Sequence, residues 1–295
     1  MHAIVSSMSS DPSTVLDESM GELDIAVMKP VVITTWSQEL ADTFKDAKVI
    51  GLGLQGVDLG RMGAISLIQL TEAGSGRVYL LDVYGMEPAD DNELINWMRG
   101  LLESESVVKV MHDCRMGSDA LEHLLKITLV GVHDVACWHE VLHGKSDAPI
   151  KTVCSVYNLQ ADAGPSGKDY LANYKLWGAR PLTAKLVGWG VKDAGNVLEV
   201  YKRQVAAASA KQVEQAQKKV VLALDVLRGA QMEMVPVGAR KLGGFIGRDA
   251  CALRGLQQSS GTRIYPRGLR SEGNFCVFYR DAAGLDAVKR KVAAM

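Results

Sequence analysis

The sequence predicts an α/β protein with a mixed β-sheet flanked by helices, followed by a second, smaller α/β module. Three observations indicate this fold class. Three apolar segments in the first third of the chain are separated by short glycine-rich gaps, which is typical of an antiparallel meander. Strand and helix patterns then alternate. From residue 232 onward a separate strand and helix pattern begins, with a different charge balance.

The elements of the first part follow from hydrophobic periodicity and helix signals. Ser37 is the expected N-cap of a helix that ends near Phe44. The expected strands are, in chain order, 31–35, 48–54, 65–70, 77–82, 107–112 and a short one ending at Asp134. The expected helices besides the first are 91–102, 118–125 and several more up to Tyr201.

A long segment without proline joins the two parts. Within residues 197–230, apolar side chains recur at spacings of three and four, which predicts an amphipathic helix: Val213, Ala216, Val220, Leu224 and Leu227. We expect this helix to connect the domains, although a short dimer-forming coiled coil has the same pattern. The expected organisation is a disordered tail 1–28, a first domain 29–204, a helical linker 205–231 and a second module 232–295.

Composition excludes several classes of protein. No apolar run reaches the roughly 18–20 residues of a membrane helix, and the N-terminus lacks the basic and apolar pattern of a secretory signal. The cysteines include no C-x-x-C pair, so neither a zinc ribbon nor a thioredoxin-like site is indicated. We therefore expect no membrane partner and an intracellular location, in the cytoplasm, the nucleus or an organelle.

Charge is distributed unevenly although the whole chain has a formal net charge of −1. Residues 232–295 hold 11 Lys and Arg against 5 Asp and Glu, whereas the rest of the chain holds 22 against 29. A basic module on an acidic body is typical of nucleic-acid binding, and a solvated basic face is the alternative.

Two short motifs suggest chemistries that the surrounding sequence does not support. Gly51–Gly56 fits G-x-G-x-x-G, but the seven residues before the next strand leave no room for the crossover helix of a dinucleotide site. His139–His143 fits H-E-x-x-H, but no later histidine or nearby glutamate offers a third zinc ligand. We interpret these histidines as residues of a helix surface.

Three sequence blocks resemble the RNase D-like branch of the DEDD-type 3′–5′ exonucleases, which includes exonuclease 3′–5′ domain-containing proteins and Egalitarian. The blocks are Val49–Gly60 with the two strands after it, Lys109–Leu121 leading to Val132–Ala136, and Trp177–Thr183 with Trp189–Asp193. His112-Asp-Cys-Arg and Arg180-Pro-Leu-Thr are the most specific parts. The resemblance implies an RNase H-like mixed sheet flanked by helices.

The same resemblance implies a degenerate catalytic site. The family uses Asp-x-Glu on the first strand, an Asp five residues after the histidine of the second block, and Tyr-x3-Asp on the last helix, and these carboxylates hold two divalent ions. On this chain the positions fall on Gly53, Gln55, Gly117, Trp189 and Asp193, of which only Asp193 keeps its acid. We therefore expect no bound metal, with Mg²⁺ or Mn²⁺ as cofactor only if the site is active.

Neighbouring acids are not expected to replace the lost ones. Asp119 lies two residues beyond Gly117 on a helix, about 200° around its axis, and therefore points away. Asp58 lies three residues beyond Gln55, on the opposite face if the strand continues that far.

Residues 232–294 resemble a KH domain, a single-strand RNA and DNA binder. Phe245-Ile-Gly-Arg-Asp-Ala250 stands where that family has its G-x-x-G loop between two helices, and Gly261-Thr-Arg-Ile264 enters the next strand. The resemblance implies that this loop approaches the backbone of about four nucleotides. The implied nucleic-acid-binding residues are Lys241, Ile246, Gly247, Arg248, Ala250, Arg254 and Arg263, whereas Asp249 opposes phosphate.

We expect, from these resemblances, a protein that binds single-stranded nucleic acid, RNA rather than DNA, and acts as a scaffold or adaptor in RNA processing with an inactive exonuclease-like domain. An active metal-dependent exonuclease with a rearranged site is one alternative. A structural subunit that binds protein partners, or a homodimer, is the other.

Overall fold

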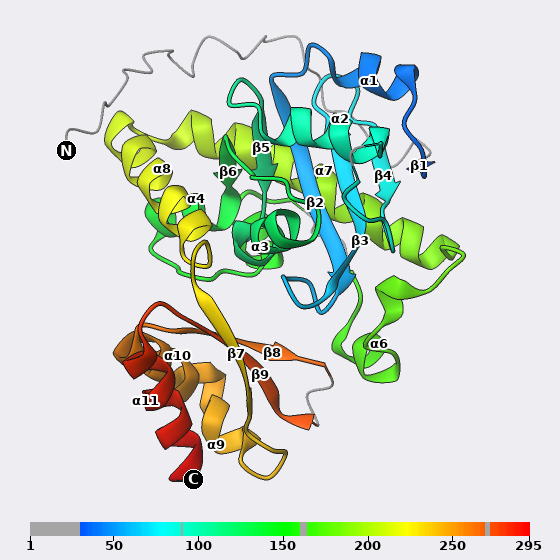
Figure 1. Ribbon diagram of the computed structural model, residues 1–295. Coiled ribbons are helices and arrows are strands. Elements are labelled where there is room, and N and C mark those ends of the chain that lie inside the picture. Colours follow the sequence, from blue (N-terminus) through cyan, green and yellow to red (C-terminus); the bar gives the residue numbers. More distant parts are fainter. Residues whose placement is uncertain (1–29, 90, 160–163, 269–271) are drawn as a thin grey trace, which may run out of the picture.

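The computed structural model describes residues 30–295 except 90, 160–163 and 269–271, so the expected tail 1–28 lies outside the described residues. The larger sheet has the strand order β1-β4-β3-β2-β5-β6 (Figure 1). Its strands are β1 (Val31–Ile33), β2 (Val49–Val57), β3 (Ala64–Glu72), β4 (Val78–Asp82), β5 (Val108–Met111) and β6 (Val132–Asp134). β2, β3 and β4 form the expected antiparallel meander. β1 pairs in parallel with β4, β5 with β2, and β6 with β5, which confirms the mixed sheet.

Helices cover both faces of this sheet. They are α1 (Gln38–Phe44), α2 (Glu93–Leu102), α3 (Cys114–Leu124), α4 (Val135–His143), α5 (Ile150–Val156), α6 (Gly167–Ala172), α7 (Ala184–Ala207) and α8 (Ala210–Asp225). α1, α2 and α3 bury their apolar sides in the main core on one face, and α7 crosses the other face behind β2 to β5 (Figure 1). Ser37 caps α1 as expected, by accepting a hydrogen bond from the Leu40 N–H.

β2 separates the two layers because its side chains alternate between the faces of the sheet. Ile50 and Leu52 are buried in the core beneath α3, whereas Gly51 and Gly53 face α7. A Cβ atom at Gly51 would lie only 2.6 Å from the Ala194 carbonyl oxygen. The glycine therefore lets the α7 backbone rest directly on the strand.

The segment expected as one linker helix is instead two helices. Ser209 begins α8 with a capping box in which it exchanges hydrogen bonds with Gln212. Ala216, Val220 and Leu224 are buried in the main core with α3 and the sheet. The periodicity predicted the apolar stripe, but it does not say what the stripe packs against, and the structure places it on the first domain.

Two further elements differ from expectation. α3 begins at Cys114 rather than near residue 118, because the Asp134 carboxylate accepts hydrogen bonds from the N–H groups of Asp113 and Cys114 and so satisfies the start of the helix. His143 is exposed on α4 as expected, but His139 is buried, because α7 and α8 both pack against α4.

The motif Arg180-Pro-Leu-Thr has a structural role. The Arg180 guanidinium donates to both carboxylate oxygens of Asp82, at 2.8 and 2.5 Å, and to the Ser66 hydroxyl. The Asp82 carboxylate is thus engaged at the end of β4.

The second module contains β7 (Gln231–Pro236), α9 (Leu242–Ile246), α10 (Cys251–Ser260), β8 (Arg263–Arg267), β9 (Asn274–Tyr279) and α11 (Ala282–Ala293). Its strands pair antiparallel in the order β7-β9-β8. Phe245 of α9 and Phe275 of β9 meet in its core with ring centroids 5.0 Å apart. The order of elements agrees with the sequence pattern.

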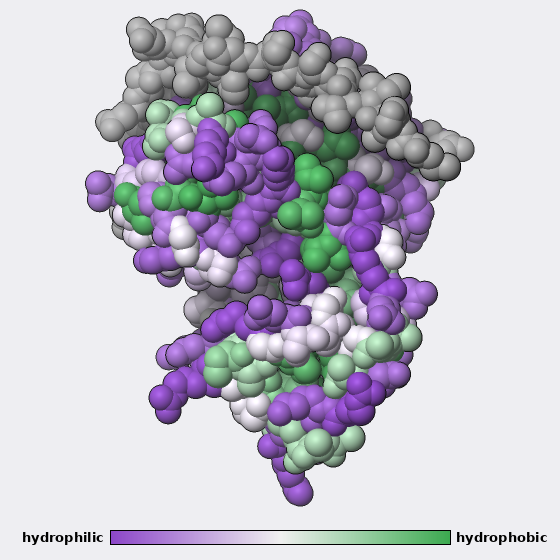
Figure 2. Space-filling view, turned by 90° about the vertical axis from the view of Figure 1, so that its left-hand side faces the viewer, coloured by the Kyte–Doolittle hydropathy of each residue, from purple (hydrophilic) through white to green (hydrophobic). Residues whose placement is uncertain are grey.

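The smaller module contacts the larger domain at the turn between β2 and β3 (Figure 1). The Gly268 N–H donates to Asp58 at 2.9 Å, and the Arg267 guanidinium donates to the Met62 carbonyl. In the space-filling view the two lobes meet at a waist bordered largely by hydrophilic residues (Figure 2). None of the described helices has the length and apolarity to cross a membrane.

Candidate nuclease site and nucleic-acid interface

Three of the positions aligned with metal ligands meet in one pocket. Gly53 and Gln55 of β2 and Gly117 of α3 line a cavity of about 240 Å³. Most of its remaining wall is apolar, formed by Leu52, Leu54, Leu59, Met111, Met116, Ile150 and Val197. A site for two divalent cations would need clustered anionic oxygens, whereas most of this wall is hydrocarbon.

The Gln69 amide fills the space beside Gly53. Gln69 pairs with Gly53 across the β2–β3 ladder, and a Cβ atom at Gly53 would lie 2.2 Å from Gln69 Oε1. The Gln69 side chain is fully buried, and neither its oxygen nor its nitrogen has a hydrogen-bond partner among the described residues. The position of the first family carboxylate is thus taken by a neutral amide.

Hydrocarbon surrounds the position of the second-block acid. A Cβ atom at Gly117 would lie 3.2 Å from Leu54 Cδ1 and 3.3 Å from Met111 Cε. Asp119, two residues further along α3, points away as expected: its carboxylate is buried and paired with Arg61 at 2.6 Å.

One carboxylate does line this pocket, that of Asp113. It accepts hydrogen bonds from Arg115 Nε at 2.7 Å and Nη2 at 2.9 Å. Burial alone would raise the pKa of Asp113, but these hydrogen bonds and the charge of Arg115 hold that pKa below its ordinary value. The oxygens of Asp113 are therefore engaged by a cation of the protein itself.

Trp189 and Asp193 lie on α7. The Trp189 ring packs edge to face on Trp177, with centroids 6.4 Å apart, and the Lys185 ammonium lies 4.5 Å from the Trp189 ring centroid. An indole offers only a donor, so Trp189 cannot orient a water as a tyrosine hydroxyl can. The side chain of Asp193 lies outside the described residues.

The described donors do not fit a pair of divalent ions. Gly53 and Gly117 bring no side-chain oxygen, Gln55 brings a neutral amide, and Asp113 is bound to Arg115. Across the described part of the chain, no three His, Cys, Asp or Glu side chains gather as a metal site. No catalytic step can be derived through such ions from this arrangement.

The loop between α9 and α10 has a backbone conformation that requires glycine at its first position. Gly247 has φ 73°, and a Cβ atom there would lie 2.8 Å from the Ala252 Cβ. Asp249 and Ala250 follow with φ 49° and 58°, a left-handed conformation that is costly for residues with a Cβ atom. The chain thus makes a tight turn directly before α10.

The predicted binding residues of the module fall into two groups. Gly247, Arg248 and Ala250 form the turn directly after Ile246, the last residue of α9, while Arg254 and Arg263 lie beyond it on α10 and β8. Arg248 and Arg254 are exposed, and neither makes an ion pair within the described residues. Lys241, by contrast, donates to the Val292 carbonyl at 2.9 Å, which engages its ammonium at the end of α11.

Sequence reasoning missed Gln69 as the residue that occupies the space beside Gly53. The available signal was a glutamine in the otherwise apolar segment Ile65-Ser-Leu-Ile-Gln-Leu70, which must pair with a neighbouring strand in a meander. Arg61, which bridges Asp119 and the chain entering the second module, gave no comparable signal.

The fold and the position of the pocket correspond to the architecture of a 3′–5′ exonuclease domain. A model of the 3′-5′ exonuclease family matches residues 31–203, more than half of the chain. The chain therefore belongs to this family.

The relatives found by sequence are larger proteins. The chain is 30% identical to the Egalitarian protein homolog of Caenorhabditis elegans over 151 residues, covering 47% of this chain and 25% of that protein. It is 36% identical to the piRNA biogenesis protein EXD1 of Xenopus laevis over 90 residues, covering 30% of this chain and 19% of that protein. The chain thus matches about a quarter or less of these relatives.

Solved structures share the fold. Trypanosoma brucei RNase D superimposes with a TM-score of 0.56 at 20% identity, over 67% of this chain and 72% of that one. Brucella melitensis NrnC with bound Mg²⁺ gives 0.54 at 12% identity, over 66% and 89%. At this identity the likeness concerns the fold alone.

Proposed function

We propose that this protein binds single-stranded RNA without cutting it, as a scaffold or adaptor in RNA processing. Its exonuclease-like domain has lost the metal chemistry, and its C-terminal module is a KH-like strand binder. The observation that carries the proposal is the replacement of a carboxylate cluster by a pocket whose wall is mostly apolar. In the described part of the chain, exposed arginines without an ion pair also lie beside a tight glycine turn.

The pocket supports binding without cleavage on electrostatic grounds. A carboxylate cluster without metal ions repels a phosphate backbone, because like charges at short range oppose each other strongly in a partly buried site. Gly53, Gly117 and the Gln69 amide remove that repulsion. The pocket therefore repels the phosphates of an uncut strand less strongly.

The C-terminal module supports the KH-like assignment through its order of elements. A strand, two helices, two strands and a helix follow one another, and the turn with Gly247 separates the two adjacent helices. The turn precedes the N-terminus of α10, and backbone N–H groups at such a terminus favour phosphate. Arg248 within the turn and Arg254 one turn into α10 add positive charge.

The names of similar proteins favour RNA over DNA. One relative is a piRNA biogenesis protein, and one structure of similar fold is Trypanosoma brucei RNase D in complex with an RNA.

The test measures binding and cleavage on one preparation of the full chain. We expect a fluorescent single-stranded RNA of about twelve nucleotides to bind at low salt, with affinity falling as salt rises. Replacing Arg248 and Arg254 by Ala should weaken binding and reduce the salt slope by about 0.7 for each phosphate that the variant no longer neutralises. Arg290→Ala is the matched control, since Arg290 is an exposed arginine on α11 of the same module.

Each alternative has its own signature in the same assay. Shortening of the RNA from its 3′ end in Mn²⁺, abolished by Asp193→Ala, would establish an active nuclease instead. Absence of binding at low salt would refute RNA binding and favour a protein-binding subunit. Equal losses for Arg290→Ala and the turn variants would show that only general charge matters.

A further inference from the structure

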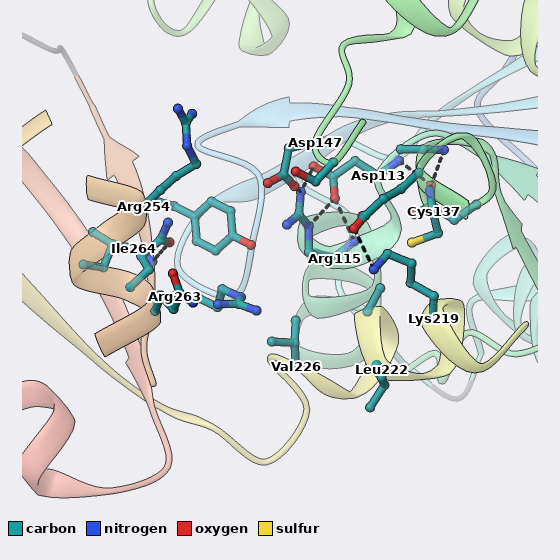
Figure 3. A pocket seen from close by; sticks show the side chains of 18 residues that line it. Asp113, Arg115, Cys137, Asp147, Lys219, Leu222, Val226, Arg254, Arg263 and Ile264 are labelled. Atoms are coloured by element: carbon teal, nitrogen blue, oxygen red, sulfur yellow. Dashed lines mark hydrogen bonds and ion pairs between the residues drawn. The ribbon is translucent and has the colours of Figure 1, made fainter. Parts of the chain in front are cut away.

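A cleft of about 580 Å³ lies between the two domains (Figure 3). One wall belongs to the exonuclease-like domain and carries Asp113, Arg115, Lys219 and Leu222. The facing wall belongs to the C-terminal module and carries Arg254 and Arg263. The volume falls within the range of about 300–1,000 Å³ that is typical of ligand pockets.

The charges of the first wall are mostly compensated within that wall. Arg115 pairs with Asp113 at 2.7 Å and with Asp147 at 2.9 Å, and Lys219 pairs with Glu140 at 2.9 Å. These carboxylates still have lone pairs that can accept hydrogen bonds from exocyclic amines of bases.

The charges of the facing wall are positive and have no ion-pair partner in the described part of the chain. Neither Arg254 nor Arg263 forms an ion pair within the described residues. The only hydrogen bond that Arg263 donates there is a long one, 3.4 Å, to the neighbouring Thr262 carbonyl. This wall also continues directly from the Gly247 turn, because α10 begins at Cys251 and carries Arg254 on its first turn.

Two side chains that line the cleft are distinctive among the described residues. Leu222 of α8 is 69% exposed, which is unusual for a large apolar side chain. The Tyr265 hydroxyl is buried without a hydrogen-bond partner among the described residues, and burial raises the pKa of Tyr265 to about 12, so it remains a donor. A ligand with flat apolar faces would cover the exposed Leu222 side chain.

We propose that this cleft is a composite site for a single RNA strand that continues from the Gly247 turn, with phosphates on Arg254 and Arg263 and bases against Leu222 and the facing carboxylates. The inference rests on the proposed function and extends the bound strand from one domain to both. One wall carries arginines that have no ion pair among the described residues, and the other carries acceptors and an exposed apolar side chain. This arrangement matches the two edges of a single strand.

The test compares two glutamate variants on the same helix. Leu222→Glu adds a negative charge to the cleft and removes an apolar contact. Val221→Glu is the matched control, because Val221 is also exposed, at 57%, but does not line the cleft. Both positions are solvent-exposed, so both variants should fold, which thermal unfolding of each variant would verify.

The readout uses two lengths of fluorescent single-stranded RNA. An oligonucleotide of about four nucleotides fits the turn alone, and one of about twelve can reach the far wall. We expect Leu222→Glu to weaken binding of the longer strand about tenfold and to leave the shorter one within about twofold, while Val221→Glu changes neither. A strand carrying 4-thiouridine should also cross-link to α8.

The outcomes separate this inference from the proposed function. If the unaltered chain binds neither RNA, the proposed function fails and this inference with it. If both RNAs bind but Leu222→Glu behaves as Val221→Glu does, with no cross-link on α8, the strand stays on the C-terminal module and the composite site alone is refuted. Competition by a protein ligand but not by RNA would assign the cleft to a protein partner.

Discussion

Replacing Arg61 by Ala should strongly destabilise the protein, because Arg61 joins both domains. Its guanidinium donates to Asp119 Oδ1 at 2.9 and 2.6 Å, and to the carbonyls of Ala230 and Leu227 at 2.7 and 2.9 Å. It also lies 5.1 Å from the Phe278 ring centroid. The β2–β3 turn, α3 and the start of the C-terminal module are thus held by one side chain.

The magnitude follows from burial. The side chain of Arg61 is 14% exposed and that of Asp119 is 1% exposed. Removing one partner of such a pair leaves a buried charge without compensation, which costs about 3–5 kcal/mol. After Arg61→Ala, Asp119 would keep the hydrogen bond from the backbone N–H of residue 61, at 2.8 Å, so we expect the lower half of that range.

Urea unfolding followed by circular dichroism and tryptophan fluorescence measures this loss. Lys218→Ala is the control, because the Lys218–Glu214 ion pair is equally short, 2.5 Å, but both side chains are about two-thirds exposed or more. Exposed pairs contribute about 0–1 kcal/mol. A double-mutant cycle with Asp119→Asn isolates the pair.

The reasoning would be refuted if Arg61→Ala cost no more than Lys218→Ala, or if the cycle gave no coupling between Arg61 and Asp119. A second consequence concerns binding. Looser docking of the module lowers the effective concentration of one wall of the cleft relative to the other. The affinity for the longer RNA should then fall more than that for the shorter one.

Three further predictions concern single positions. Gly53→Asp should lower the free energy of unfolding by about 1–3 kcal/mol, because the new side chain overlaps Gln69, and it should not create Mg²⁺-dependent cleavage. The loss should be smaller in a Gln69→Ala background. Equal losses in both backgrounds would contradict the overlap. Burial lowers the pKa of His133 to about 3. In the unfolded chain the pKa is about 6.5, so below that pH His133 takes up a proton on unfolding. The free energy of unfolding should therefore fall by about 1.4 kcal/mol between about pH 7.5 and about pH 5.5. Chemical denaturation at both pH values checks this, and His133→Gln should flatten the dependence. Ala250→Gly should stabilise the module by about 1 kcal/mol because φ is 58° there, and an unchanged unfolding midpoint would argue against strain at this turn.

Much of the fold could be predicted from local patterns. The glycine-rich gaps between three apolar segments predicted the meander, and it is observed as β2, β3 and β4. Ser37 predicted the start of α1. Both rest on short-range rules, the reach of a turn and the satisfaction of the first N–H groups of a helix, so neighbouring residues suffice to decide them.

The candidate site could be predicted only in part. The spacing of the family blocks placed Gly53, Gln55 and Gly117 together, and the structure gathers them in one pocket. What occupies the space beside Gly53 was not predictable, because Gln69 reaches Gly53 across a ladder whose register depends on the whole sheet.

The sequence by itself determined that Gly53 and Gly117 bring no carboxylate, since a glycine has none in any fold, and it also located the tight turn at Gly247. Tertiary structure alone decided that α8 packs on the first domain, that Arg61 joins the domains, and that Arg254 and Leu222 line one cleft from two domains. The physical reason is range. Side-chain identity and local turns are properties of neighbouring residues, whereas burial, pairing of charges and the shape of a cleft depend on segments that only the completed fold brings together.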